Sequence, residues 1–469
     1  MRIDANYNTS EVIVRFISRV RLKDIPREIR ETAKLHVLDG FATILGGVGE
    51  EASLVIRRHV SHWGARRESS VIGTNIKVPA QHAALANGVQ GHVLDFDDAQ
   101  LATLASRPLG QQTHPTTPVL SASLAIAEKI QASPSAFLAS YIVGVEVACR
   151  LGDAVEPSHY LEGFHPTGTF GTFGATAAAA HLLNLNARHV GSALGIAGTL
   201  AAGLRANRGT MAKALNAGRA AENGVLAATL AGTGFTGSLN IFDDAMGFFS
   251  AACRNQINRK LLRFGRHYFF AHPGIAVKLY PCAGVLHPAL DVLLELTQRH
   301  EIHFKQVRTI SVIMDSTAAL PLVYDRPKDG LQARFSLPFA IAVALLDREA
   351  GIEQFTTERA RDRRVRSLMS HVELSRSVSE PSDNRVSAPT RVEIYLNDGR
   401  HYQGKASIAR GHPKLPPSRG EIEQKFRDCS RRVLRPQAIE QFLQTFWTLE
   451  ACKSLTLNAL IRPLRSMRA

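Results

Sequence analysis

The sequence predicts a mainly α-helical fold with a smaller α+β part inserted late in the chain. Apolar residues recur at helical spacing through most of the first half of the chain. Residues 307–315 then alternate as a strand does, and residues 391–409 carry a hairpin signal at Asn397, Asp398 and Gly399. Helical spacing returns over residues 418–455.

Start signals place several helices in the first half. Ser10 is a predicted N-cap, and Pro26 opens a second helix whose apolar stripe ends near residues 46–47. Ser133 and Pro134 begin another. These segments are rich in Ala, Ile and Val, so we expect them to pack on one another.

The composition is that of a soluble globular protein with room for two domains: 469 residues, 45% hydrophobic and 21% charged. Five separated cysteines without a CxxC pair argue against a zinc cage, an iron–sulfur cluster or a disulfide scaffold. No charged-then-apolar leader begins the sequence, and no stretch approaches 18 apolar residues. We therefore expect a cytoplasmic protein that makes no membrane contact.

The net charge of +15 raises the possibility of nucleic-acid binding. The basic residues are dispersed, however, with local clusters only at residues 254–266, 359–366 and 462–468. Aromatic residues follow a basic cluster only once, at residues 268–270. We expect no nucleic-acid partner, because a positive field equally suits a small anionic substrate.

The densest group of acids is Asp95, Asp97 and Asp98, with His92 upstream and a Thr-His-Pro turn at residues 113–115. At helical spacing His92, Asp95 and Asp98 share one face and Asp97 points elsewhere. Two buried carboxylates one turn apart raise each other's pKa, which makes a proton carrier. The alternative is a solvated helix end, although the helix dipole disfavours acids there.

Two further stretches combine small residues with one polar side chain. Residues 163–181 predict a glycine-rich loop with open backbone N–H groups that leads into a helix, and His165 begins it. A lone histidine there is either structural or functional. Lys213 is the only charge between Gly209 and Gly218, so it needs an anionic partner, either a protein carboxylate or a substrate carboxylate.

Five motifs occur in order along the chain: NGVQGHVLDFDD, GFHPTGTFG, GTMAKALNAGRAAENG, KLYPCAGVLHPALD and GHPKLPPSRGEIEQKF. Together they resemble the MmgE/PrpD family over about residues 8–450. The resemblance implies a large all-helical domain built from both chain ends, residues 1–268 and 411–469, with an inserted α+β lid domain at residues 269–410. It also implies a homodimer that works without a metal ion or other cofactor.

The resemblance further implies a site for a small anionic carboxylate substrate. Its catalytic residues are Asp95, His114, His165 and Tyr324, and its substrate-binding residues are Lys213 and Lys278. This chain departs from the family pattern in three ways. The stretch between Asp98 and His114 is longer, Ala99 replaces a frequent threonine, and Ala283 stands where the decarboxylase branch has a histidine.

Family members such as 2-methylcitrate dehydratase, cis-aconitate decarboxylase and iminodisuccinate epimerase imply proton transfer beside a carboxylate. Fixed positive groups stabilise the negative charge that develops there. Loss of hydroxide, reprotonation and loss of carbon dioxide are then three outcomes of one carbanion-like state. The sequence favours a 2-methylcitrate dehydratase-like carbon–oxygen lyase, with an epimerase or isomerase, or a cis-aconitate decarboxylase-like activity, as alternatives.

Two other protein classes fit parts of the sequence. Aspartate-rich helix ends in helical proteins also hold Mg²⁺ for diphosphate chemistry, since this cation prefers oxygen ligands. A catalytically silent dimeric binding protein would result if the long segment before His114 displaced that side chain from the site.

Overall fold

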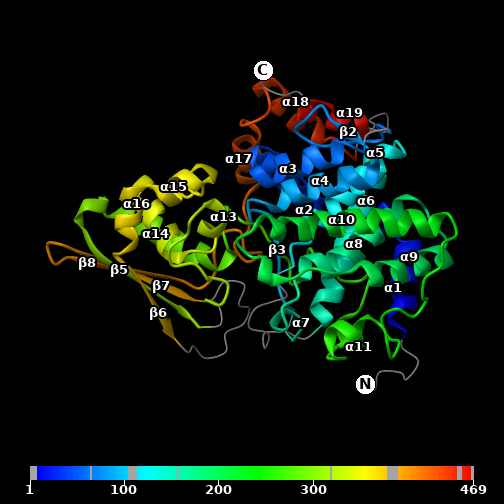
Figure 1. Cartoon of the computed structure of the whole chain (residues 1–469), viewed down its shortest axis with the longest axis horizontal. Coiled ribbons are helices and arrows are strands. Elements are labelled where there is room, and N and C mark those ends of the chain that lie inside the picture. The colour runs from blue at the N-terminus through cyan, green and yellow to red at the C-terminus, as the bar shows by residue number, and fades with distance from the viewer. Residues whose placement is uncertain are drawn as a thin grey trace.

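The computed structural model describes residues 8–63, 66–103, 113–155, 158–316, 319–377, 389–450 and 457–465. The protein is mainly α-helical, as predicted, and contains two hydrophobic cores that lie next to one another (Figure 1). The larger core is helical, and the smaller core packs helices against a four-stranded sheet.

The larger core draws on both ends of the chain (Figure 1). Its early helices are α1 Thr9–Arg19, α2 Arg27–Gly46, α3 Glu51–Ser61, α4 Ala80–His92, α5 Thr116–Lys129, α6 Pro134–Ala154, α7 Ser158–Leu161, α8 Pro166–Leu182, α9 Ala187–Leu200, α10 Met211–Gly232 and α11 Phe248–Cys253. Its late helices are α17 Arg419–Ser430, α18 Pro436–Phe446 and α19 Leu457–Ile461. Phe442 of α18 lies 5.3 Å from Phe41 of α2 and 5.0 Å from Phe426 of α17, between ring centroids.

The smaller core is organised around a sheet of order β6-β5-β7-β8. Its strands are β5 Val307–Asp315, β6 Val372–Ser377, β7 Thr390–Leu396 and β8 His401–Ala406, and its helices are α12 His287–Arg299, α13 Gly330–Ala333, α14 Leu337–Asp347, α15 Thr357–Arg361 and α16 Arg363–Met369. Strand β5 runs parallel to β6 and antiparallel to β7. The predicted strand at residues 307–315 and the predicted hairpin, now β7–β8, are both confirmed.

Two short strand pairs lie within or beside the larger core. Strand β1 Ser69–Ser70 pairs with β2 Lys77–Val78, and β3 Ala99–Gln100 pairs with β4 Ile275–Ala276. The second pair joins the chain just after the acidic cluster to the segment that leads into the smaller core. It therefore lies between the two cores (Figure 1).

Helix starts follow the local signals with one exception. The Ser133 side chain caps α6 by accepting from the backbone N–H of Ala136, and Ser418 forms a capping box with Glu421 at the start of α17. The predicted cap at Ser10 is wrong. Asn8 caps α1 instead, because its side-chain oxygen accepts the backbone N–H of Glu11 at 3.0 Å.

The helix in the glycine-rich stretch begins earlier than predicted: residues 166–174 are helix rather than loop, and the helix continues through the predicted residues 175–180. Helix α8 starts at Pro166, and its glycines face neighbouring elements at short range. A Cβ at Gly171 would lie 2.9 Å from Pro118, and one at Gly174 would lie 2.7 Å from the Cβ of Ala148. The glycines therefore allow neighbouring elements to pack closely against α8. A single sequence does not distinguish glycines placed for close packing from glycines of a loop.

Helices α4 and α10 touch through their backbones. A Cβ on Gly88 of α4 would lie 2.7 Å from the Cα of Gly218, and one on Gly218 would lie 2.7 Å from the carbonyl oxygen of Leu85. Helix α4 ends at His92, and Lys213 lies in the first turn of α10. This close crossing therefore fixes the distance between two side chains of the candidate site.

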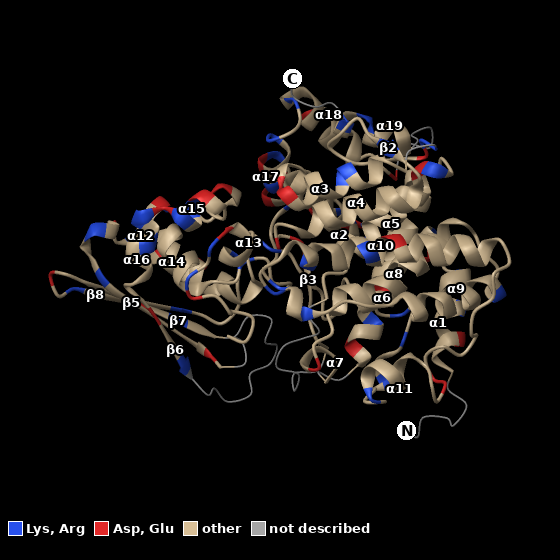
Figure 2. Cartoon of the chain, in the orientation of Figure 1, with Lys and Arg blue, Asp and Glu red and all other residues tan. Residues whose placement is uncertain are grey.

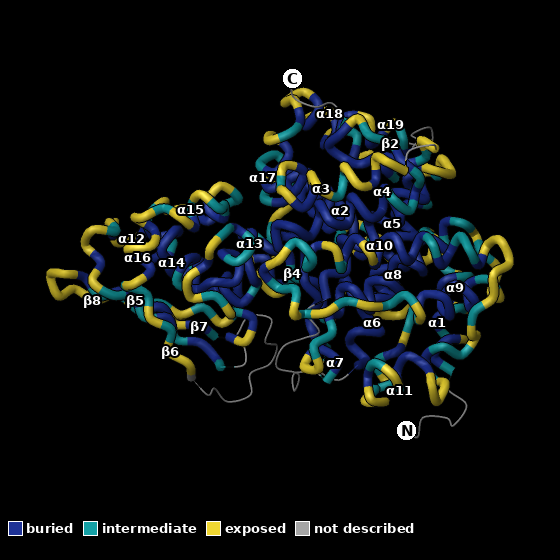
Figure 3. Tube along the Cα trace, viewed as in Figure 1, coloured by how far each residue is buried: buried dark blue, intermediate teal, exposed yellow. Residues whose placement is uncertain are grey.

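Among the described helices, α6 alone is long and apolar enough to cross a membrane. From the sequence we expect no stretch of that length and composition. In this structure 89% of its apolar window is buried. Helix α6 also contains Glu146 and Arg150, which pair with each other at 2.7 Å. These features are those of a core helix. Figure 3 shows the same pattern over the larger core, with buried helices inside and exposed segments around them.

We expect Gly218→Ala to lower the free energy of unfolding by about 1–3 kcal/mol, because the new methyl group meets a main-chain oxygen that cannot turn away. Urea denaturation measures this change. Gly232→Ala is the matched control on the same helix, since Gly232 is exposed and its nearest neighbour is the flexible end of Leu185 at 3.3 Å. That variant should stay within about 1 kcal/mol of wild type. A Gly218→Ala protein as stable as the wild type would contradict the backbone contact.

Candidate active site

The acidic cluster does not continue helix α4, so its predicted arrangement is wrong. The helix ends at His92, and Asp95 takes a left-handed backbone conformation with φ of 52°. His92, Asp95 and Asp98 therefore do not share a helical face. Asp97 folds back instead, and its carboxylate accepts from Nδ1 of His92 at 2.8 Å and from the hydroxyl of Thr117 at 2.8 Å.

Asp95 lies between two buried or nearly buried lysines. Lys278 Nζ donates to its Oδ2 at 2.9 Å and to its backbone oxygen at 2.8 Å, and Lys213 Nζ donates to its Oδ1. Burial alone would raise the pKa of Asp95, but Lys213 and Lys278 hold it well below its ordinary value. Asp95 is therefore ionised, and the predicted carboxylate with a raised pKa is corrected.

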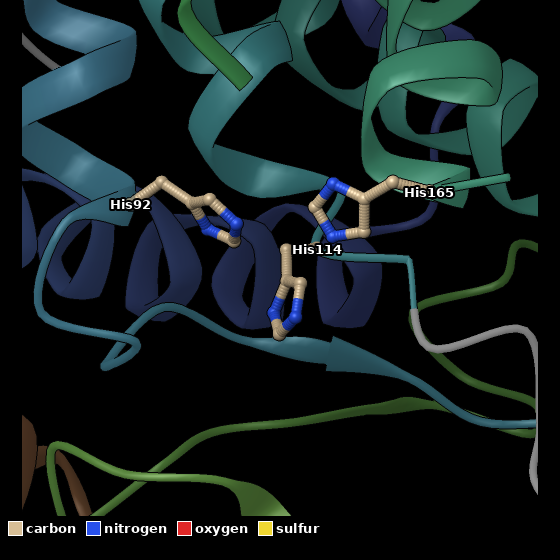
Figure 4. A group of neighbouring side chains, drawn as sticks. All are labelled: His92, His114 and His165. Carbon is tan, nitrogen blue, oxygen red and sulfur yellow. The ribbon is translucent and has the colours of Figure 1, made fainter. Parts of the chain in front are cut away.

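Three histidines from separate segments meet beside this ion pair (Figure 4). They are His92 at the end of α4, His114 just before α5 and His165 at the start of α8. The ring centroid of His92 lies 4.9 Å from that of His114 and 5.5 Å from that of His165. His114 thus lies within the cluster. The longer segment that precedes it, residues 104–112, lies outside the described residues.

Each Nδ1 of the three histidines has its own partner. His92 donates to Asp97, and His114 donates to the backbone oxygen of Asp98 at 2.6 Å, so both rings keep an Nε2 lone pair when neutral. His165 Nδ1 instead accepts from the side-chain amide of Asn216 at 3.0 Å, so a neutral His165 carries its proton on Nε2. The cluster therefore offers two acceptors and one donor.

Burial keeps these histidines neutral. It lowers the pKa of His114 to about 3, although the Asp97 carboxylate opposes the shift. Burial also lowers the pKa of His92, and it lowers that of His165 well below its usual value with help from the positive charges nearby. The free site therefore places uncharged imidazoles beside the contacts of Asp95 with Lys213 and Lys278.

The ring nitrogens of the three histidines lie within 4.8 Å of one another, a spacing that metal ligands can have. Two features oppose a cation there. His165 presents an N–H, and Lys213 and Lys278 lie close enough to depress the histidine pKa values. A magnesium site is not supported either, because Asp95, Asp97 and Asp98 are engaged by lysine, histidine or threonine side chains.

A pocket opens onto this group. Its polar and charged lining residues are Asp95, Gln100, His114, Tyr160, His165, Arg205, Arg208, Lys213 and Lys278. Ala99 and Ala283 also line it. The structure therefore brings together five of the six predicted site residues. The sixth, Tyr324, is half-buried outside the lining, and its hydroxyl donates to the backbone oxygen of Arg208 at 2.9 Å.

Several residues of the site were missed by sequence reasoning. Lys425 of α17 pairs with Asp39 at 2.6 Å, and its Nζ donates to the backbone oxygens of Phe96 at 2.9 Å and Lys278 at 2.8 Å. It therefore ties together the segments that carry Asp95 and Lys278. The sequence indicates a role for Lys425 only through its place in the last of the five motifs, GHPKLPPSRGEIEQKF.

Arg205 and Arg208 were also missed. They lie between α9 and α10 in a stretch that reads as an ordinary loop, and the structure alone places them in the pocket.

A carboxylate held by two lysines beside neutral histidines, in a basic pocket, defines a site for acid–base chemistry on a small anion. The comparisons agree with the fold and the motifs. The MmgE/PrpD N-terminal domain matches residues 11–260, and the MmgE/PrpD C-terminal domain matches residues 280–450. The chain belongs to the MmgE/PrpD family.

Its relatives include proteins named cis-aconitate decarboxylase. The one from Homo sapiens is 27% identical over 94% of this chain and 92% of its own length. The one from Mus musculus is 26% identical, with 96% and 93% covered. The one from Aspergillus terreus strain NIH 2624 is 26% identical, with 99% and 98% covered.

The buried histidines predict a loss of stability in mild acid. His114 and His287 both have a pKa of about 3 because of burial, whereas an unfolded histidine has one of about 6.5. Below pH 6.5 the unfolded chain binds protons that the native chain does not. The free energy of unfolding should fall as the pH drops from 6.5 toward 3, by up to about 1.4 kcal/mol per pH unit for each histidine.

Urea denaturation at a series of pH values tests this prediction. His114→Asn should flatten the pH dependence by about one histidine's share, up to about 1.4 kcal/mol per pH unit. His62→Asn, at an exposed position, is the matched control and should leave the pH dependence as in wild type. Equal slopes for wild type and His114→Asn would refute the predicted role of His114.

Proposed function

We propose that this protein is a lyase that acts at a carbon beside a carboxylate of a small di- or tricarboxylate, without a metal ion. The observation that carries the proposal is the position of Asp95 between Lys213 and Lys278, facing neutral histidines in one pocket. Membership of the MmgE/PrpD family and the similarity to proteins named cis-aconitate decarboxylase support carboxylate chemistry.

In this proposal His114 is the base. Its Nδ1 proton is held by the backbone oxygen of Asp98, so Nε2 offers a lone pair to a substrate C–H. Its pKa of about 3 makes it a weak base in the free enzyme. A substrate with several negative charges would raise that pKa, because nearby anions favour the imidazolium. The base then gains strength when the substrate is bound.

The remaining groups hold charge and deliver protons. Lys213 and Lys278 stabilise the negative charge that develops as the C–H bond breaks. Burial lowers the pKa of Lys213, so this ammonium is also a readier acid for the leaving group. His165 offers its Nε2–H to a substrate oxygen, and Asp95 keeps the two ammonium groups in place. The proposed role of Tyr324 is to support the backbone of Arg208 from outside the pocket.

We place loss of water first among the possible outcomes. Ala99 and Ala283 are buried in the pocket wall and supply no proton donor, and Ala283 takes the place of a histidine expected in the decarboxylase branch. Loss of carbon dioxide is the second candidate, supported by the relatives named cis-aconitate decarboxylase. Epimerisation by reprotonation is the remaining alternative.

Proton NMR in deuterated water separates these outcomes. A panel of hydroxy and unsaturated di- and tricarboxylates, including 2-methylcitrate and cis-aconitate, should reveal an alkene after loss of water, a shortened acid after loss of carbon dioxide, or deuterium exchange alone. The activity should be the same with EDTA. Collapse of the rate on chelation would contradict the metal-free proposal.

We expect Asp95→Asn to lower kcat/KM on the substrate found in this way by about 10²–10⁴-fold. The change leaves Lys213 and Lys278 without their shared counter-ion, so both ammonium groups lose their placement. The pKa of Lys213 also falls further, because the Asp95 carboxylate is a charge that raises it. Asparagine tolerates the left-handed backbone at this position, so the fold should persist. Asp398→Asn in the exposed β7–β8 turn is the control and should keep the wild-type rate. An Asp95→Asn rate within threefold of wild type would overturn the assignment.

The homodimeric state and the cytoplasmic location remain predictions, as does the absence of a nucleic-acid partner. Figure 2 shows Lys and Arg interspersed with Asp and Glu over both cores, which fits a dispersed rather than a focused positive charge. Sedimentation of the purified protein measures its oligomeric state. The alternative of a catalytically silent binding protein required His114 to lie outside the site. His114 lines the pocket, so we do not propose this alternative.

A further inference from the structure

Arg205 and Arg208 line the same pocket as the lysines and histidines, and both are half-buried. The Arg205 guanidinium lies over the ring of Tyr160, 3.5 Å from its centroid, and donates to the backbone oxygen of Tyr160. Arg208 donates to the hydroxyl of Tyr160 at 3.0 Å. No carboxylate in the described part of the chain lies within 4.0 Å of either guanidinium. Both guanidinium groups therefore keep donors that no carboxylate in the described part of the chain accepts from.

The backbone fixes these arginines relative to His165. His165 N–H donates to the carbonyl of Gly203 at 2.9 Å, and Arg205 N–H donates to the carbonyl of Gly163 at 2.8 Å. Phe164 and Leu204 form a bridge between these two bonds. The guanidinium groups are therefore presented from a segment that is paired with the segment of a proposed catalytic residue, and not from a free loop.

The charges of the pocket lining do not cancel. Among the residues that the structure describes, the lining contains four cations, Lys213, Lys278, Arg205 and Arg208, and one carboxylate, that of Asp95, and burial keeps the histidines neutral. Three positive charges therefore remain. A dicarboxylate neutralises two of them, whereas a fully ionised tricarboxylate neutralises all three. Asp95 already occupies donors of both lysines, so the arginines are the cations most available to an additional carboxylate.

We propose that Arg205 and Arg208 form a second carboxylate subsite of the pocket. This inference rests on the proposed function and assigns two further substrate-binding residues to it. The reacting carboxylate lies near Asp95, Lys213 and Lys278, and a carboxylate remote from the reacting carbon binds the guanidinium groups. Arg208 is the main anchor, because the Arg205 guanidinium is already held by the ring and carbonyl of Tyr160. Planar guanidinium groups suit carboxylates, since they donate two parallel hydrogen bonds.

Isothermal titration calorimetry with two unreactive probes tests the subsite. Propane-1,2,3-tricarboxylate and pentanedioate both have three carbons between their terminal carboxylates, and only the first has a third carboxylate. Wild type should bind the tricarboxylate about 10- to 100-fold more tightly, as expected for hydrogen bonds between charged groups. Arg208→Gln should weaken binding of the tricarboxylate by a similar factor. It should leave the affinity for the dicarboxylate within about threefold of the wild-type value.

Arg188→Gln, an exposed arginine on α9, is the matched control for the loss of one positive charge and should change neither affinity by more than about twofold. Arg208→Lys keeps the charge without the planar donor pair and should restore part of the discrimination. The ligand-free melting temperature of each variant shows whether the fold is intact.

If Arg208→Gln weakened the binding of both probes equally, the subsite would be overturned. The positive charge of Arg208 would then attract any anion at long range instead of binding a particular carboxylate. No change in either affinity would overturn it too. An enzyme that turns over a substrate in the NMR panel but fails to distinguish the two probes would refute the subsite and leave the lyase proposal standing. A wild-type protein that neither binds nor turns over any carboxylate would remove the proposed function, and the subsite with it.

Discussion

The ion pair of Asp95 with Lys213 and Lys278 is the interaction on which the site depends. Lys213 comes from α10 in the larger core, and Lys278 comes from the segment that leads into the smaller core. Taking these groups out of water is costly, and their mutual contacts offset the cost only while all three stay together. The pair therefore couples the packing of two cores to the geometry of the chemistry. The same contacts keep Asp95 ionised, whereas burial keeps the neighbouring histidines neutral.

A further buried lysine next to this ion pair binds backbone oxygens. Lys425 is paired with Asp39 and donates to the backbone oxygens of residues on both sides of the site. A late helix, α17, thus braces segments from the early and middle parts of the chain (Figure 1). This arrangement gives a physical reason for the C-terminal helices to return to the larger core, since the site is incomplete without them.

Local chemistry made much of the fold predictable from the sequence. The cap at Ser133, the alternation of residues 307–315 and the turn at residues 397–399 all act within a few residues, so one sequence contains the whole signal. The glycines of α8 were misread because their reason is a neighbour distant in sequence. The acids after His92 were misplaced because the left-handed turn at Asp95 breaks the helical period. Motif resemblance found five residues of the pocket, whereas the arginines became visible only when the chain was folded.

The hydrogen bond from His114 to the backbone oxygen of Asp98 has a consequence for how this site tolerates sequence change. A tautomer fixed by a neighbouring carboxylate can be lost through one side-chain substitution, but a carbonyl is present whatever residue stands at position 98. Substitutions at position 98 can shift the main chain, but they cannot remove the backbone oxygen that accepts the hydrogen bond. Position 98 can therefore change while the Nε2 lone pair of His114 is retained.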